Sequence, residues 1–209
     1  MYEGMRRLAL LLLAFAACGA SNDAAGPDAA GPGDGGADVT TAALSCASYC
    51  ATIQAACTAD IQQYSDMADC MNSCAAFPVG AASDTSGDTL GCRTTFAKKA
   101  ATSAAMAKAE CTHAGPGGDG VCGDNCSGYC DIAMMYCTDA NMAKLYDTRA
   151  QCMSDCARRA TDMKLDTGTG PRTDMGNEVA CLLYHAQMGS VVPGSHCLGD
   201  LAITDGSCL

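Results

Sequence analysis

The chain has 209 residues, with 12 Lys or Arg against 23 Asp or Glu, and its formal net charge at pH 7 is −11. Such an acidic chain lacks the basic face that phosphate groups require, which argues against nucleic acid or anionic lipid as a partner. It has no Trp and three Phe but 17 Cys. With so few large apolar side chains, we expect disulfides to supply much of its stability.

The N-terminal segment, residues 1–17, has the parts of a secretory signal peptide. Arg6 and Arg7 precede an apolar run over residues 8–17. The run is shorter than the roughly 20 apolar residues that span a bilayer. Secretion would place the cysteines in a compartment where they can oxidise.

Two cleavage sites compete in this segment. Residues 14–16, Ala-Phe-Ala, fit the rule for ordinary signal peptidase, whereas residues 15–19, Phe-Ala-Ala-Cys-Gly, resemble the lipobox of bacterial lipoproteins. The lipobox pattern more often has Leu at the position of Phe15. Acylation of Cys18 would leave sixteen cysteines that can pair completely, whereas ordinary cleavage leaves an odd thiol. We therefore favour lipidation of Cys18.

The lipobox resemblance implies a membrane anchor. Cys18 would carry a diacylglycerol and an amide-linked acyl chain such as palmitate, and two or three chains hold a protein firmly. Gly19 after the cysteine resembles lipoproteins that are forwarded to the outer membrane. Residues 19–38 contain only Ala, Gly, Pro, Asp, Ser and Asn. This composition cannot form a core, so residues 18–43 are predicted to be a lipid anchor followed by a disordered tether.

The remaining sixteen cysteines form two sets of eight. The gaps between successive cysteines are 3, 6, 12, 3, 17, 18 and 10 residues in the first set and 3, 6, 14, 3, 24, 15 and 10 in the second. Tyr49 and Tyr129 occupy matching positions, as do Tyr64 and Tyr146. We interpret the chain as two tandem modules, residues 44–122 and 123–209.

Each module is predicted to be helical. One helical stripe in the first module consists of Cys46, Tyr49, Cys50, Ile53 and Cys57. Ser45 is placed to cap this helix. A second stripe runs over residues 64–74, and Pro78 and Gly80 would end that helix. A third helix is expected at about 89–110, where alanine dominates, and its shorter counterpart at 177–188.

Two antiparallel helices with cysteines at i and i+4 can be linked by two disulfides. This geometry predicts the pairs Cys46–Cys74, Cys50–Cys70, Cys126–Cys156 and Cys130–Cys152. The other eight cysteines have no order that spacing can decide: Cys57, Cys92, Cys111, Cys122, Cys137, Cys181, Cys197 and Cys208. The predicted fold is all-α, with two small disulfide-stapled modules, each a helical hairpin plus a third helix.

Catalytic motifs are nearly absent. The chain has no C-x-x-C, no P-loop, no G-x-S-x-G and no G-x-G-x-x-G after a strand. Residues 115–120 are glycine-rich, but they link two cysteines and indicate a structural turn. We therefore expect no enzymatic activity, no catalytic residue and no cofactor.

Few side chains of this chain could bind a metal ion. Bridged cysteines cannot be ligands, so only imidazoles, thioethers and carboxylates remain. His113, His185 and His196 are weak candidates because they are spread over both modules. The twelve methionines fall on helical stripes and are expected to fill the core.

Two segments carry a family resemblance. They are Cys-Arg-Thr-Thr-Phe-Ala at 92–97 with the run at 111–122, and Cys-Leu-Leu-Tyr-His-Ala at 181–186 with His-Cys at 196–197. Both resemble a repeat of cysteine-rich bacterial lipoproteins that runs roughly C-R-x-Y-H-A, then H-C-x-H-A-G-P-x-G-x-G-x-C. Phe96 and Glu110 replace two histidines of that pattern, while Leu182 and Gly199 replace its Arg and its last His. The resemblance implies no activity.

These observations lead to one main functional hypothesis. The chain is expected to be a cell-envelope lipoprotein, anchored in the outer membrane, with a non-catalytic structural or protein-interaction domain. Its expected partners are the membrane and another envelope or extracellular protein. The alternative is a periplasmic or extracellular metal-binding protein that uses His and Met.

Overall fold

The computed structural model describes residues 44–141, 143–158, 179–197 and 208. All regular elements in these residues are helices, so the all-α prediction is confirmed. Residues Thr40–Leu209 belong to one compact unit. The predicted signal peptide, Cys18 and the tether up to residue 43 lie outside the described residues.

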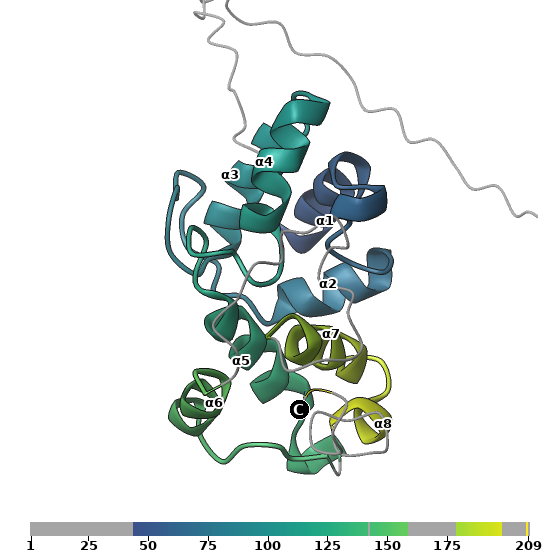
Figure 1. Cartoon of the computed structure of the whole chain (residues 1–209), viewed down its shortest axis with the longest axis vertical. Coiled ribbons are helices and arrows are strands. Elements are labelled where there is room, and N and C mark those ends of the chain that lie inside the picture. The colour runs from purple at the N-terminus through teal and green to yellow at the C-terminus, as the bar shows by residue number, and fades with distance from the viewer. Residues whose placement is uncertain (1–43, 142, 159–178, 198–207, 209) are drawn as a thin grey trace, which may run out of the picture. The chain divides into compact units, whose positions relative to one another are not determined.

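The first half begins with two helices that form a hairpin (Figure 1). These are α1 (Cys46–Ala56) and α2 (Met67–Ala75), with a 3-10 turn, η1 (Ala59–Ile61), between them. The Ser45 side chain accepts a hydrogen bond from the Ser48 amide, so Ser45 caps α1 as the sequence predicts. Asp66 caps α2 in the same way, and the helix therefore begins later than the stripe over 64–74 indicates.

The alanine-rich segment forms two helices rather than the single helix predicted over 89–110. They are α3 (Leu90–Ala100) and α4 (Ala104–Ala114). The Thr102 hydroxyl donates to the carbonyl of Lys99 at 2.7 Å, and the Ser103 side chain caps α4. Side chains that bond locally to the backbone end one helix and begin the next, and helix propensity alone does not reveal this break.

The second half repeats the order of elements. Two helices, α5 (Asn125–Tyr136) and α6 (Arg149–Cys156), flank the 3-10 turn η2 (Asp139–Asn141). The last two helices are α7 (Val179–Gly189) and α8 (Pro193–Cys197). The second half therefore also ends in a helix pair rather than in the single third helix that was predicted.

Eight disulfides link the sixteen described cysteines. Four are the pairs that the hairpin geometry predicts: Cys46–Cys74, Cys50–Cys70, Cys126–Cys156 and Cys130–Cys152. The other four, whose order spacing left open, are Cys57–Cys111, Cys92–Cys122, Cys137–Cys197 and Cys181–Cys208. In each half the first cysteine pairs with the fifth, the second with the fourth, the third with the seventh and the sixth with the eighth.

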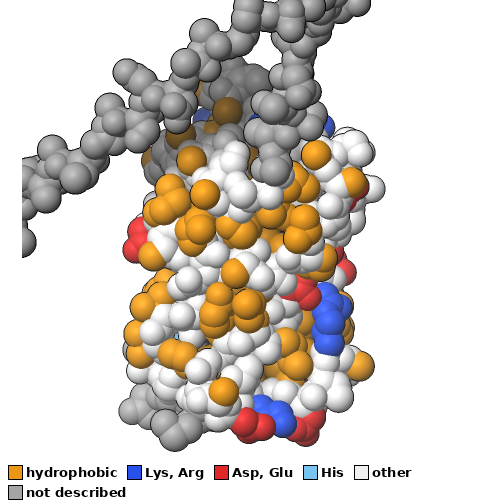
Figure 2. Space-filling view, turned by 180° about the vertical axis from the view of Figure 1, so that it is seen from behind, with side chains coloured by type: hydrophobic (Ala, Val, Ile, Leu, Met, Phe, Trp, Pro, Cys, Tyr) orange, Lys and Arg blue, Asp and Glu red, His pale blue; other side chains and the backbone are white. Residues whose placement is uncertain are grey.

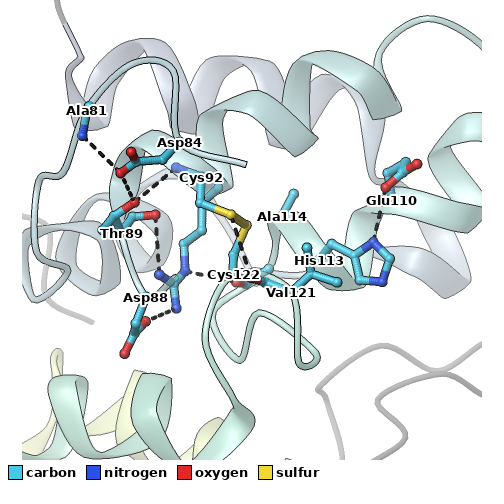
Figure 3. Close-up of a disulfide and its surroundings, with 12 residues drawn as sticks. Ala81, Asp84, Asp88, Thr89, Cys92, Glu110, His113, Ala114, Val121 and Cys122 are labelled. Atoms are coloured by element: carbon cyan, nitrogen blue, oxygen red, sulfur yellow. Dashed lines mark hydrogen bonds and ion pairs between the residues drawn. A yellow bond between two sulfur atoms is a disulfide. The ribbon is translucent and has the colours of Figure 1, made fainter. Parts of the chain in front are cut away.

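The surroundings of the Cys92–Cys122 disulfide show how the loops are held (Figure 3). The Asp84 carboxylate accepts hydrogen bonds from the Ala81 amide at 2.9 Å and from the Thr89 hydroxyl at 2.8 Å. Thr89 in turn caps α3 through the Cys92 amide, at 3.1 Å. These polar contacts order the segment before α3, and the disulfide joins the start of α3 to the loop that carries Cys122.

The glycine-rich segment at 115–120 is a turn, as predicted. Gly118 has φ +75°, and a Cβ at this position would lie 2.0 Å from the carbonyl oxygen of Cys122. Gly118 and Cys122 lie this close because the turn is tight: the backbone amides of Val121 and Cys122 both donate hydrogen bonds to the Gly118 carbonyl oxygen, at 3.0 Å. Only glycine fits this close approach without strain.

The core is built largely from cysteines, alanines and tyrosines. Tyr49, Tyr64, Tyr129 and Tyr146 are all buried, and helices of both halves contribute to one cluster. Contrary to the prediction, none of the methionines that the structure describes is buried in this core. Met67, Met71 and Met135 are exposed, while Met134 and Met153 pack against its edge. A helical stripe shows which residues share a face, but it does not show how much of that face a small core covers.

The two halves contact each other directly. The Tyr136 hydroxyl of α5 donates to the carbonyl of Asn72 on α2 at 2.7 Å. The side-chain amide of Asn72 donates to the hydroxyl of Ser190, the residue directly after α7, at 3.2 Å. These hydrogen bonds place α2 against α7, as Figure 1 also shows.

Candidate functional site

Two histidines of the second half lie together. His185 comes from the middle of α7 and His196 from the short helix α8. Their Nδ1 atoms are 3.1 Å apart, and the centroids of the two imidazole rings are 5.3 Å apart. One ring therefore donates a hydrogen bond to the other, or both nitrogen atoms can face a shared ligand.

A disulfide adjoins each of these histidines. Cys181 lies one helical turn before His185 and is bonded to Cys208, while Cys197 directly follows His196 and is bonded to Cys137. Ligand atoms of Cys181, His185 and Cys208 lie within 4.8 Å of one another. Because both sulfur atoms belong to a disulfide, neither is a thiolate that could bind a metal ion.

The environment favours the neutral form of His196. The His185 side chain is buried and His196 is half-buried. Burial lowers the pKa of His196, and the neighbouring His185 lowers it further. Tyr184 packs edge-on against both imidazole rings, with centroid distances of 5.2 Å to His185 and 6.3 Å to His196.

The matching positions of the first half hold different side chains. Phe96 is four residues after Cys92, as His185 is after Cys181, and Glu110 directly precedes a cysteine as His196 does. His113 contacts both of them. Its ring packs edge-on against Phe96. Its Nδ1 lies 3.0 Å from the Glu110 carboxylate, as Figure 3 shows. The structure thus brings His185 and His196 together and gives His113 separate neighbours.

A charged cluster at the boundary between the halves was not expected from the sequence. Arg93 of α3 is buried and its guanidinium donates to Asp88 at 2.7 Å. Arg149 at the start of α6 donates to Asp131 of α5 at 2.8 Å and lies 3.6 Å from Asp88. Two carboxylates and two guanidinium groups from both halves therefore share one site.

Burial has a marked effect on Asp131. Its Oδ2 atom and that of Asp88 are buried and accept no hydrogen bond from the residues that the structure describes. The pKa of Asp131 is raised to about 6: burial raises it most, the hydrogen bond from Arg149 lowers it, and the neighbouring charge of Asp88 raises it. Sequence spacing gave no signal for this cluster, because it forms only when the two halves pack together.

Comparison with known protein families links part of the chain to one of them. Residues 34–125 match a family model described as BfoA family C-terminal domain. The match to the BfoA C-terminal domain covers α1 to α4 and ends at the first residue of α5. No curated protein and no solved structure matches the chain.

The disulfides indicate where the protein is found. Eight disulfides in one chain are typical of an oxidising, extracytoplasmic compartment. Among the described residues, no helix has the length and apolar character needed to cross a membrane.

Proposed function

We propose that the protein is a cell-envelope lipoprotein whose disulfide-rich helical region is a non-catalytic structural or protein-interaction domain. One observation carries the proposal: the sixteen cysteines after Cys18 are all paired, eight in each half. Cys18 is then the one cysteine left for acylation, in a segment that resembles a lipobox. The anchor and its outer-membrane location belong to the proposal.

We further propose that the two halves arose by duplication of one module. The same order of disulfide pairing in both halves supports this. A tyrosine pair at matching positions in each half also supports it. The two rings pack edge-on in both pairs, with centroids 6.2 Å apart for Tyr49 and Tyr64 and 6.3 Å apart for Tyr129 and Tyr146. The match to the BfoA C-terminal domain ends near the proposed boundary at residue 122.

The surface is compatible with protein interaction. Val79 is 60% exposed and Val191 58% exposed, and Met67, Met71 and Met135 are also exposed. Figure 2 shows one face on which apolar side chains lie in several groups, with few charged side chains between them. Apolar groups on an exposed surface often mark sites where another protein binds.

The anchor is tested by the intact mass of the mature protein, measured before and after reduction with alkylation. We expect an acylated Cys18 and sixteen thiols that become alkylated only after reduction. The matched control is Cys18→Ser, which keeps the sixteen cysteines and should move the protein from the membrane fraction to the soluble fraction. A free Cys18 thiol in the wild-type protein would contradict the proposal.

The interaction role is tested with a photo-crosslinking residue placed at Met71, on the exposed face of α2. Crosslinking in intact cells should give one discrete adduct with an envelope protein. The same crosslinker at Lys108, an exposed position on α4, serves as the control. Equal, diffuse labelling from both positions would indicate that this face binds no specific partner.

A further inference from the structure

The His185–His196 pair has the geometry of two ligands on one ion. Bonds from imidazole nitrogen to zinc are about 2.0–2.1 Å long, and copper has a similar preference for imidazole. With the two Nδ1 atoms 3.1 Å apart, two such bonds would meet at an angle of roughly 100°. This value lies between the square-planar and tetrahedral angles.

We infer that His185 and His196 bind a single divalent transition-metal ion, Cu²⁺ more tightly than Zn²⁺, each through its Nδ1 atom. The order follows the general rise in affinity of nitrogen sites up to copper. Water would complete the coordination, as it does in sites with an open position. Both rings would carry their proton on Nε2 when the metal is bound, so the Nδ1–H that now joins the two rings would no longer be present.

The structure holds the two rings in place before any ion arrives. The Cys181–Cys208 disulfide fixes α7 one turn before His185, and the Cys137–Cys197 disulfide fixes the residue next to His196. Packing against Tyr184 restricts both imidazole rings. A ligand that is already ordered loses little conformational entropy on binding.

The overall charge of the chain also favours cation binding. The chain carries a formal net charge of −11, which attracts cations to its surface.

The first half provides an internal comparison. At the matching positions it has Phe96 and Glu110, and the Lys99 ammonium lies 3.9 Å from the centroid of the Phe96 ring. An aromatic ring without a donor atom and an ammonium group next to it do not suit a metal ion. The metal site therefore belongs to the second half alone and is separate from the structural role proposed above.

The test uses the oxidised, untagged chain, freed of metal and titrated separately with CuCl₂ and ZnCl₂ in a non-coordinating buffer at pH 7. We expect one equivalent of either ion by isothermal titration calorimetry. His196→Ala should weaken binding about tenfold or more, because it removes one ligand at a half-buried position. His113→Ala, a matched histidine loss in the first half, should bind as the wild type does.

A second variant distinguishes loss of the metal ligands from misfolding. His185→Phe with His196→Glu copies the residues of the first half, and its disulfides can be mapped by peptide mass to show that it folds. This variant should bind no stoichiometric ion. Failure of the wild type to bind one equivalent, or equal binding by the wild type and this double variant, would overturn the inference. Neither result depends on Cys18, so failure of the metal site would not contradict the proposal that the protein is a lipoprotein.

Discussion

Tyr64 donates its hydroxyl proton to Tyr49 in the core of the first half. The two hydroxyl oxygens are 2.7 Å apart, and the Tyr49 hydroxyl itself donates to the carbonyl of Ala114 at 2.6 Å. Because Tyr49 has only one proton, Tyr64 must be the donor in the pair. Burial raises the pKa of both hydroxyls, so both stay protonated at ordinary pH.

Because Tyr64 donates to Tyr49 and Tyr49 donates to Ala114, removing the two hydroxyls should destabilise the fold by different amounts. Tyr64→Phe keeps the Tyr49–Ala114 hydrogen bond and should lower the free energy of unfolding by about 1 kcal/mol. Tyr49→Phe takes the donor from a buried carbonyl and the acceptor from Tyr64, and should cost about 2 to 3 kcal/mol. Urea unfolding of the oxidised variants measures both. Equal losses would show that the hydrogen bonds do not run in this direction.

Because Arg93 and Asp88 form a buried ion pair, the effect on stability of replacing Arg93 should depend on whether Asp88 is still charged. Arg93 also donates to the carbonyls of Gly115 and Pro116, at 3.2 and 3.1 Å. Arg93→Leu should therefore destabilise the fold by about 3 to 5 kcal/mol, because it leaves Asp88 partly buried without this partner.

The second half suggests the matched control for this change. At the positions that correspond to Arg93 and Asp88 it has Leu182 and Asn177, so both charges are absent together. Adding Asp88→Asn to Arg93→Leu should recover part of the lost stability in a double-mutant cycle. If the double variant is less stable than Arg93→Leu alone, the isolated carboxylate is not the main source of the cost.

The raised pKa of Asp131 predicts a pH dependence. In the folded protein this pKa is about 6, against 3.8 for the unfolded chain. A raised carboxyl pKa stabilises the fold fully below the unfolded value, and this contribution is lost as pH rises through about 6. Asp131→Asn cannot titrate, so its stability relative to wild type should increase between about pH 4 and pH 7.

The measurement for Asp131 is urea unfolding at several pH values in that range. Asp60→Asn, at an exposed position, is the control for the removal of one acidic charge. The difference between wild type and Asp131→Asn should change with pH, whereas the Asp60→Asn difference should change less. Parallel curves for all three proteins would show that Asp131 does not titrate in this range.

Local features of this fold were predictable, and features that depend on packing were not. Cysteines at i and i+4 define a helical face, so the hairpin disulfides followed from spacing, and Ser45 was recognisable as a cap. The turn at Ser103 was missed because alanine favours helix on both sides of it. Contacts such as His185 with His196, or Asp131 with Arg149, join separate helices, and no sequence periodicity encodes them.

Disulfides that close long loops should contribute most to stability. Cys57 and Cys111 are separated by 54 residues, whereas Cys50 and Cys70 are separated by 20. The loop-closure model gives about 4 kcal/mol for the long loop and about 3 kcal/mol for the short one, because the cross-link restricts the unfolded chain more when the loop is longer. Both disulfides are buried, so replacing either pair with alanines leaves a similar cavity.

The comparison uses Cys57→Ala/Cys111→Ala and Cys50→Ala/Cys70→Ala, each unfolded in urea without reductant. The first variant should be less stable by about 1 kcal/mol, which is the difference between the loop-closure contributions of the two disulfides. Removing Cys137 and Cys197, separated by 60 residues in the second half, should match the first variant. If the short-loop variant proves less stable, then packing of α1 against α2 outweighs loop closure, and the hairpin rather than the long-range links sets the stability of each half.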